Sequence, residues 1–170
     1  MPVPILVIAP NEGLKEVVER VARQFDIPAS VEVGDMWEGV SIARAVTGSG
    51  GLDSIGVIVS RGGTAVVLRE ARLGVPIVEI QVSPYDVLRA IATARGLGKR
   101  LAVVGFANEV SGIDNIADLF DIELDEVIIQ TEDEVLSRVT EVKAQGVECV
   151  VGGTGVVRAA NYLGIPSILI

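Results

Sequence analysis

An internal repeat limits the folds open to this chain more than any other feature of its sequence. The segment 62–80 returns at 152–170, ninety residues further on. Nine positions hold the same residue in both copies; in the first copy they are Gly62, Gly63, Thr64, Val66, Val67, Leu73, Gly74, Pro76 and Ile80. So many identities at one fixed spacing indicate two homologous halves.

Each copy has the pattern of a strand, a glycine-rich turn, a helix and a second strand. In the first copy an apolar run at 57–59 leads to the glycine pair Gly62 and Gly63. A helical pattern that starts near Thr64, the predicted N-cap, stops at Gly74 before the next apolar run. Such units form parallel sheets, with the turn at the carboxyl edge of the strands.

The sequence therefore predicts an α/β fold of two similar Rossmann-like or flavodoxin-like lobes, related by duplication, with parallel sheets and a cleft between them. Hydrophobic residues make up 49% of the chain but aromatic residues only 4%, which suits strands buried on both faces. We place the lobes at 1–85 and 86–170. A parallel strand normally leads to a covering helix, and the sequence shows none after Ile170, so the C-terminal covering helix is expected to be absent.

The remaining elements follow from hydrophobic periodicity. In the first half we expect strands at 4–9, 30–33 and 53–60, helices at 14–25 and 36–46, and a flexible stretch at 47–51. In the second half we expect strands at 99–106, 126–130 and 147–151, and helices at 87–96, 113–120 and 132–145.

Composition excludes several classes of function. The net charge of −9 argues against direct binding to nucleic acid. The absence of histidine and the single Cys149, placed in an apolar run, predict no metal site and a reducing, cytoplasmic location. No apolar run approaches the ~20 residues needed to span a bilayer, so no membrane association is expected.

The turn after the first repeated strand has the composition of an anion site. Arg61 lies between the strand and the glycine pair, where its guanidinium suits a carboxylate or phosphate. The start of the following helix adds free N–H groups. The alternative is a surface arginine paired with a carboxylate such as Glu79, and Thr64 and Thr154 are equally well explained as helix caps.

Neither a nucleotide site nor an enzyme active site is well supported. The repeated Gly-Gly-Thr turn matches neither a dinucleotide fingerprint nor a P-loop, so we expect no cofactor. No nucleophile with a base is recognisable, which leaves Asp86 or Glu109 as the base of a lyase or isomerase, the main alternative function. A fold that has lost its ligand is a third alternative. Cys149 is expected to be a buried core thiol.

Three motifs resemble the N-terminal sensory domain of the propionate catabolism activator family. They are Ser60-Arg61-Gly62-Gly63-Thr64-Ala65, Pro76-Ile77-Val78-Glu79-Ile80 and Val82-Ser83-Pro84-Tyr85-Asp86-Val87-Leu88. Such domains belong to bacterial sigma-54-dependent activators, in which the sensor precedes an ATPase domain and a helix-turn-helix domain. The resemblance implies a non-catalytic receptor for a small carboxylic acid such as 2-methylcitrate, bound between two α/β lobes.

Residues and resemblance together predict one set of ligand-binding residues. They are Ser60, Arg61, Gly62, Gly63, Thr64, Ser83, Tyr85, Asn108, Gly152, Gly153 and Thr154. The expected partners are a small organic acid and, in full-length relatives, the attached ATPase and DNA-binding domains. The sequence leaves a homodimer open.

Overall fold

The chain divides into two compact units, unit 1 (Met1–Ile80) and unit 2 (Gln81–Ile170). The computed structural model describes residues 4–50, 55–110, 113 and 122–170. The division precedes the position 85/86 proposed from the sequence, because Ser83 caps a helix whose apolar face packs in unit 2.

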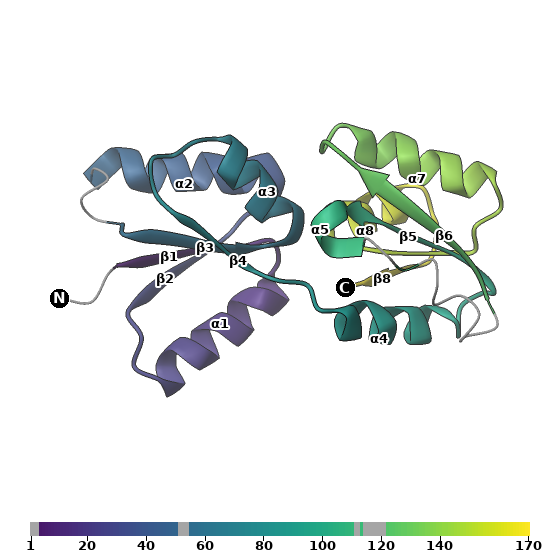
Figure 1. Ribbon diagram of the computed structural model, residues 1–170, viewed down its shortest axis with the longest axis horizontal. Helices are drawn as coiled ribbons and strands as arrows, with labels where there is room; N and C mark the ends of the chain where they lie inside the picture. The colour runs from purple at the N-terminus through teal and green to yellow at the C-terminus, as the bar shows by residue number, and fades with distance from the viewer. Residues whose placement is uncertain (1–3, 51–54, 111–112, 114–121) are drawn as a thin grey trace. The chain divides into compact units, whose positions relative to one another are not determined.

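Unit 1 contains one parallel sheet with helices on both faces (Figure 1). The strand order is β2-β1-β3-β4, and Val7 of the central β1 lies beside Val31 and Val59 of its neighbours. In chain order the elements are β1 (Ile5–Ala9), α1 (Glu12–Gln24), β2 (Ala29–Val33), α2 (Met36–Gly50), β3 (Val57–Arg61), α3 (Gly62–Glu70) and β4 (Ile77–Ile80).

Unit 2 repeats this architecture with the same strand order, β6-β5-β7-β8, again all parallel. Its elements are α4 (Pro84–Ala94), β5 (Arg100–Phe106), α5 (Ala107–Val110), β6 (Glu123–Ile129), α7 (Glu134–Ala144), β7 (Cys149–Gly152), α8 (Thr154–Tyr162) and β8 (Ser167–Leu169). The matching orders confirm the α/β fold and the two similar parallel-sheet halves.

The core of unit 1 lies mainly on one face of its sheet. There, α2 and α3 cover Leu6, Ile8 and Ile58, which are fully buried together with Leu68 of α3. Among the described elements of unit 1, α1 is the one that covers the opposite face, and α1 contains no buried residue. Unit 1 is therefore well packed on one side of the sheet and thinly covered on the other.

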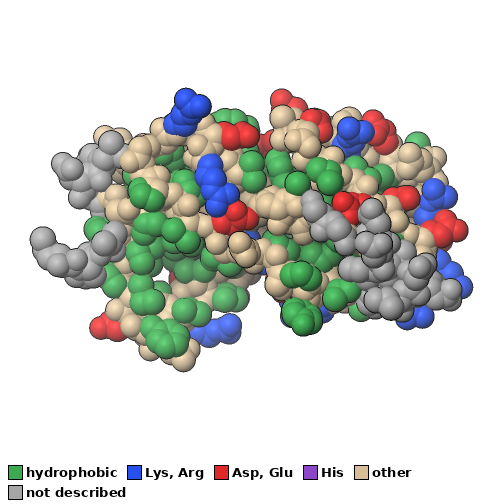
Figure 2. All heavy atoms as spheres, in the orientation of Figure 1, with side chains coloured by type: hydrophobic (Ala, Val, Ile, Leu, Met, Phe, Trp, Pro, Cys, Tyr) green, Lys and Arg blue, Asp and Glu red, His purple; other side chains and the backbone are tan. Residues whose placement is uncertain are grey.

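An apolar groove lies between α1 and this thinly covered face. It has a volume of about 310 Å³ and its lining is apolar throughout. Figure 2 shows the hydrophobic side chains gathered between α1 and the sheet of unit 1. We call this feature the α1 groove; its lining residues are Ile5, Val7, Leu14, Val17, Val18, Val21, Ala22, Ile27, Ala29, Val59 and Ile80.

Unit 2 is packed on both faces of its sheet. Val87, Ala90, Ile91 and Ala94 of α4 are buried in one cluster with side chains from β5 and β7. On the other face, α7 and α8 contact each other and contribute further buried valines and alanines. All four residues of β7 are accordingly buried.

Two local predictions are wrong, and a third concerns a segment that lies almost entirely outside the described residues. The stretch 47–50 is not a flexible loop but the last turn of α2, where Thr47 Oγ1 donates to the carbonyl of Ala43 at 2.8 Å. Thr64 is not the N-cap of α3, since the helix begins at Gly62 and Arg61 holds the cap position. The helix expected at 113–120 falls almost entirely outside the described residues.

Candidate functional site

Two loops meet at the carboxyl edge of the unit 1 sheet. The first loop joins β3 to α3 at Gly62, whose φ of +59° favours glycine. The second joins β2 to α2 and contains Asp35, which is 8% exposed, and Met36, whose φ is +49°. These loops bring the first glycine pair of the repeat next to the start of α2.

The hydroxyl of Thr64 joins the two loops. It donates to Asp35 Oδ1 at 3.0 Å and accepts from the backbone N–H of Met36, also at 3.0 Å. A hydroxyl has one proton to donate, and the hydroxyl of Thr64 donates it to Asp35 within the protein. Sequence analysis did not select Asp35, although a Gly-Asp pair directly after a strand was available as a signal.

Ser60 and Arg61 are adjacent in sequence but lie in different environments. Ser60 is fully buried, and its Oγ donates to the carbonyl of Ile8 in β1 at 2.7 Å. Arg61 ends β3, is half-buried and occupies the N-cap position of α3. The Arg61 side chain therefore leaves the backbone at the carboxyl edge of the sheet, directly before the N-terminus of α3.

The corresponding loop of unit 2 has a carboxylate beside it. Glu109 Oε2 accepts from the backbone N–H of Phe106 at 3.0 Å. A Cβ added at Gly153 would lie 3.2 Å from Glu109 Oε1, and one at Gly105 would lie 3.0 Å from Oε2. Gly153 of this loop and Gly105 of β5 thus make room for the glutamate. A carboxylate thus lies beside each repeated loop, Asp35 in unit 1 and Glu109 in unit 2, and the loop of unit 1 also contains Arg61.

Close packing also explains why position 152, the first of the second glycine pair, is a glycine. A Cβ at Gly152 would lie 2.5 Å from the carbonyl oxygen of Val104 in the neighbouring strand β5. Gly153 is the N-cap of α8, and Thr154 is the first residue of that helix. The sequence Gly-Gly-Thr therefore starts a helix in both units, as the repeat predicted.

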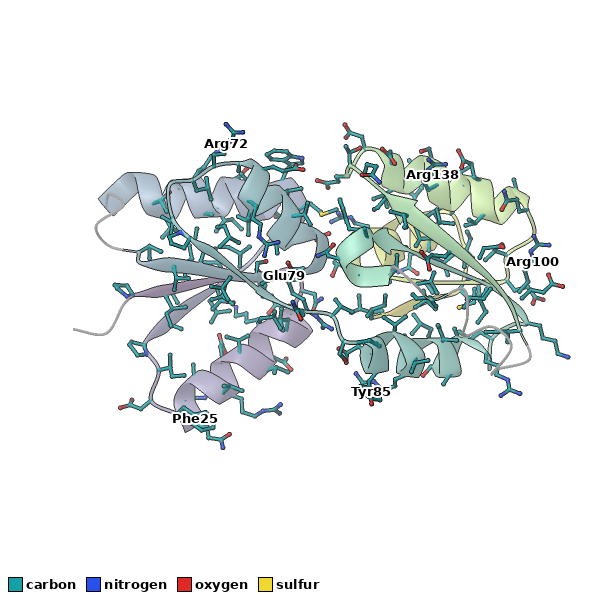
Figure 3. The ribbon with its side chains drawn as sticks, in the orientation of Figure 1. Phe25, Arg72, Glu79, Tyr85, Arg100 and Arg138 are labelled. Atoms are coloured by element: carbon teal, nitrogen blue, oxygen red, sulfur yellow. The ribbon has the colours of Figure 1, made fainter. Side chains whose placement is uncertain are left out.

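The remaining predicted ligand residues lie elsewhere in unit 2. Ser83 and Asp86 form a capping box at the start of α4, in which Ser83 Oγ accepts from the backbone N–H of Asp86 at 3.3 Å. Tyr85 is 81% exposed and points away from α4 (Figure 3). Asn108 lies on α5, the element after β5, and is exposed. Their roles in binding, like the cleft between the lobes, stay predictions.

The pKa values of Glu148 and Cys149 in unit 2 are shifted by their surroundings. Backbone N–H groups of Arg100 and Lys99 donate to Glu148 and hold the pKa of its carboxyl below the ordinary value. Burial raises the pKa of the Cys149 thiol in β7. A thiol with a raised pKa is a poor nucleophile, which agrees with a core role for Cys149.

The ranges that the structure describes form neither a metal site nor a membrane-spanning helix. Within them no group of three or more acidic, histidine or cysteine side chains is placed to hold a metal ion. Within the same ranges, no helix has both the length and the hydropathy required to cross a membrane.

A solved structure shares the fold of this chain over its whole length. A crystal structure of an NtrC family transcriptional regulator from Clostridium acetobutylicum has a TM-score of 0.89 and 22% identity, with 100% of this chain and 88% of that chain covered. A D-allose-bound solute binding protein of an ABC transporter from Actinobacillus succinogenes 130z has a TM-score of only 0.40, with 15% identity and coverages of 99% and 77%. Of these two structures, the NtrC family regulator is therefore the one that shows the fold of this chain.

A comparison with protein families assigns the chain more specifically. A family model described as propionate catabolism activator matches residues 22–170. This range includes both Gly-Gly-Thr loops, the capping box of α4 and all strands except β1. Because the match extends over most of the sequence, the chain belongs to the propionate catabolism activator family, as its Arg-Gly-Gly-Thr motif predicted.

Proposed function

We propose that this domain is the effector receptor of a sigma-54-dependent activator and that it binds a small organic anion such as 2-methylcitrate. Membership of the activator family makes it a sensing domain of a transcription regulator that contains other domains. We further propose that an ATPase domain and a DNA-binding domain are attached to this domain. The protein is cytoplasmic, and the domain has no catalytic activity.

The position of Arg61 carries the proposal of an anionic ligand. Its side chain starts at the carboxyl edge of β3, directly before the N-terminus of the nine-residue helix α3. A guanidinium and a helix N-terminus both favour negative charge. We favour unit 1 for the anion, because the position that corresponds to Arg61 in the second copy of the repeat is Val151.

The hydrogen bonds of Asp86 and Glu109, the two candidate bases, argue against the alternative function of a lyase or isomerase. Asp86 Oδ2 accepts from the backbone N–H of Ser83 at 3.1 Å and from its Oγ at 2.9 Å, as part of a helix cap. Glu109 accepts from the backbone N–H of Phe106. Both carboxylates therefore act as hydrogen-bond acceptors for the backbone, which is a structural role.

The first prediction concerns Arg61. Replacing it by Ala should weaken binding of 2-methylcitrate or citrate by about 1.5–3 kcal/mol, which is about ten- to a hundredfold, because a charge-assisted hydrogen bond is lost. Arg61→Lys keeps the charge but not the bidentate fork and should lie between wild type and Arg61→Ala. Isothermal titration measures the affinities, and recovery of the acid unchanged tests for turnover.

Arg20→Ala is the matched control, since Arg20 is an exposed arginine of unit 1 on α1. It should bind the acids as wild type does. Equal affinity of Arg61→Ala and wild type, with unchanged circular dichroism, would remove Arg61 from the site. Conversion of the acid would favour the enzyme alternative.

A further inference from the structure

The last helix of each repeat is buried to a different extent in the two units. In unit 1, α3 packs on α2, and Ala65 and Leu68 of α3 are fully buried. The repeat equates positions ninety residues apart, so Ala65 corresponds to Gly155 and Leu68 to Arg158 in α8. Gly155 is half-buried and Arg158 is exposed. The surface that is closed beside α3 in unit 1 is therefore open beside α8 in unit 2.

This opening is a groove between α7 and α8. It has a volume of about 340 Å³ and a mostly apolar lining. Glu132 and Leu136 border it on the side of α7, and Gly155, Arg158 and Tyr162 border it on α8. We call this feature the α7–α8 groove. Leu136 is 48% exposed and Tyr162 is 81% exposed, so two large apolar side chains are available for contact with a partner.

The α7–α8 groove also contains one charged side chain of each sign. Nη2 of Arg158 lies 4.0 Å from Oε1 of Glu132, and the two side chains are 61% and 30% exposed. An ion pair this long and this open to water contributes little to the stability of one chain. Its two members can therefore exchange partners with little loss of free energy.

The charges of the groove favour a second copy of this chain as its partner. The net charge of −9 repels another copy in general, but Glu132 and Arg158 are the charged residues of the groove and their charges cancel. A purely acidic or purely basic segment would satisfy one of these two charges. A second copy brings both an arginine and a glutamate and satisfies both.

We propose that the α7–α8 groove is the contact surface of a symmetric dimer of this chain. In a two-fold dimer the same surface of both copies meets, so every contact between two different residues occurs twice. Arg158 of each copy pairs with Glu132 of the other. Leu136 and Tyr162 of each copy pack around these two ion pairs, and tyrosine and arginine are the residue types that often dominate the binding energy of interfaces. The proposal does not depend on the ligand.

Charge reversal tests the pairing between the two copies. Arg158→Glu and Glu132→Arg should each weaken the dimer of the 170-residue chain at least about a hundredfold in sedimentation equilibrium, because two like-charge contacts replace two ion pairs. An equimolar mixture of the two variants should form a heterodimer with an affinity within about tenfold of the wild-type value. In this heterodimer the two introduced charges meet each other, and the native Arg158 meets the native Glu132.

The recovery in the mixture separates pairing between chains from pairing within one chain. Each variant chain has like charges at positions 132 and 158, so repair of an internal ion pair cannot restore association. Circular dichroism of each variant alone confirms that it is folded.

Two further variants make the result specific. Arg138→Glu makes the same change in net charge on α7, where Arg138 pairs with Glu134 and Glu141 of its own helix outside the groove (Figure 3). It should change the dimer affinity by less than about threefold. Tyr162→Ala should weaken the dimer but shift the unfolding midpoint of the monomer by less than about 2 °C, since Tyr162 is exposed.

Three outcomes would overturn the proposal. One is a wild-type chain that stays monomeric in solutions of up to about 1 mM. Another is a dimer that Arg158→Glu and Arg138→Glu weaken equally, because net charge alone would then explain the effect. The third is a mixture of Arg158→Glu and Glu132→Arg chains that stays monomeric, because Arg158 and Glu132 would then pair only within one chain.

Discussion

Thr64 shows how a single side chain holds the candidate site together. Its hydroxyl bonds to Asp35 and to the backbone of Met36, which lie 29 and 28 residues away in sequence. It is 2% exposed, so water does not replace these bonds when they are lost. The residue that the sequence presents as a helix cap is instead a connection between two loops.

Replacing Thr64 by Val should therefore destabilise the protein by about 1–3 kcal/mol, since the Asp35 carboxylate and the N–H of Met36 each lose a buried partner. Thr64→Ser keeps the hydroxyl and is the control, with a smaller loss from the missing methyl group. Urea unfolding followed by Trp37 fluorescence measures both. Equal stability of Thr64→Val and wild type would show that the loops are held by other contacts.

At the scale of elements, the sequence predicts type and order better than boundaries and environment. The Gly-Gly-Thr turns, the parallel strands and most helices were predictable because hydrophobic periodicity and glycine pairs act locally. The last turn of α2 was missed, since Thr47-Gly-Ser-Gly reads as a loop although Thr47 bonds back into the helix. The contact between Asp35 and Thr64 joins distant segments, which local patterns do not encode.

Two glycines in α2 should respond in opposite ways to alanine. A Cβ at Gly39 would lie 2.8 Å from the carbonyl oxygen of Gly34, whereas a Cβ at Gly48 meets nothing within 4 Å. Gly48→Ala should stabilise the protein by about 0.5–1 kcal/mol through helix propensity. Gly39→Ala should destabilise it despite the same propensity gain. Urea unfolding measures both, and a stabilising Gly39→Ala would mean that α2 shifts to make room.

At the scale of the whole molecule, the boundary at 80/81 can be tested with fragments. Fragment 81–170 retains Ser83 and Pro84, which start α4, whereas fragment 86–170 begins inside the capping box. Losing an N-cap costs about 0.5–2 kcal/mol. We expect 81–170 to unfold cooperatively in urea, and 86–170 to be less stable by that amount when followed by circular dichroism.

A disordered 81–170 fragment would show that unit 2 needs unit 1 in order to fold. Equal stability of the two fragments would show that the capping box contributes little to α4. Neither fragment contains any part of unit 1, so the circular dichroism signal reports on unit 2 alone.

The crossing of α4 from the end of β4 into unit 2 has a consequence for the ancestry of the protein. A single repeat encoded alone would have made a strand whose next helix packs on the sheet of another copy. Two such chains satisfy each other by exchanging helices, as in a domain-swapped dimer. Gene fusion would then have turned an exchange between two molecules into the passage from β4 to α4 seen in one polypeptide.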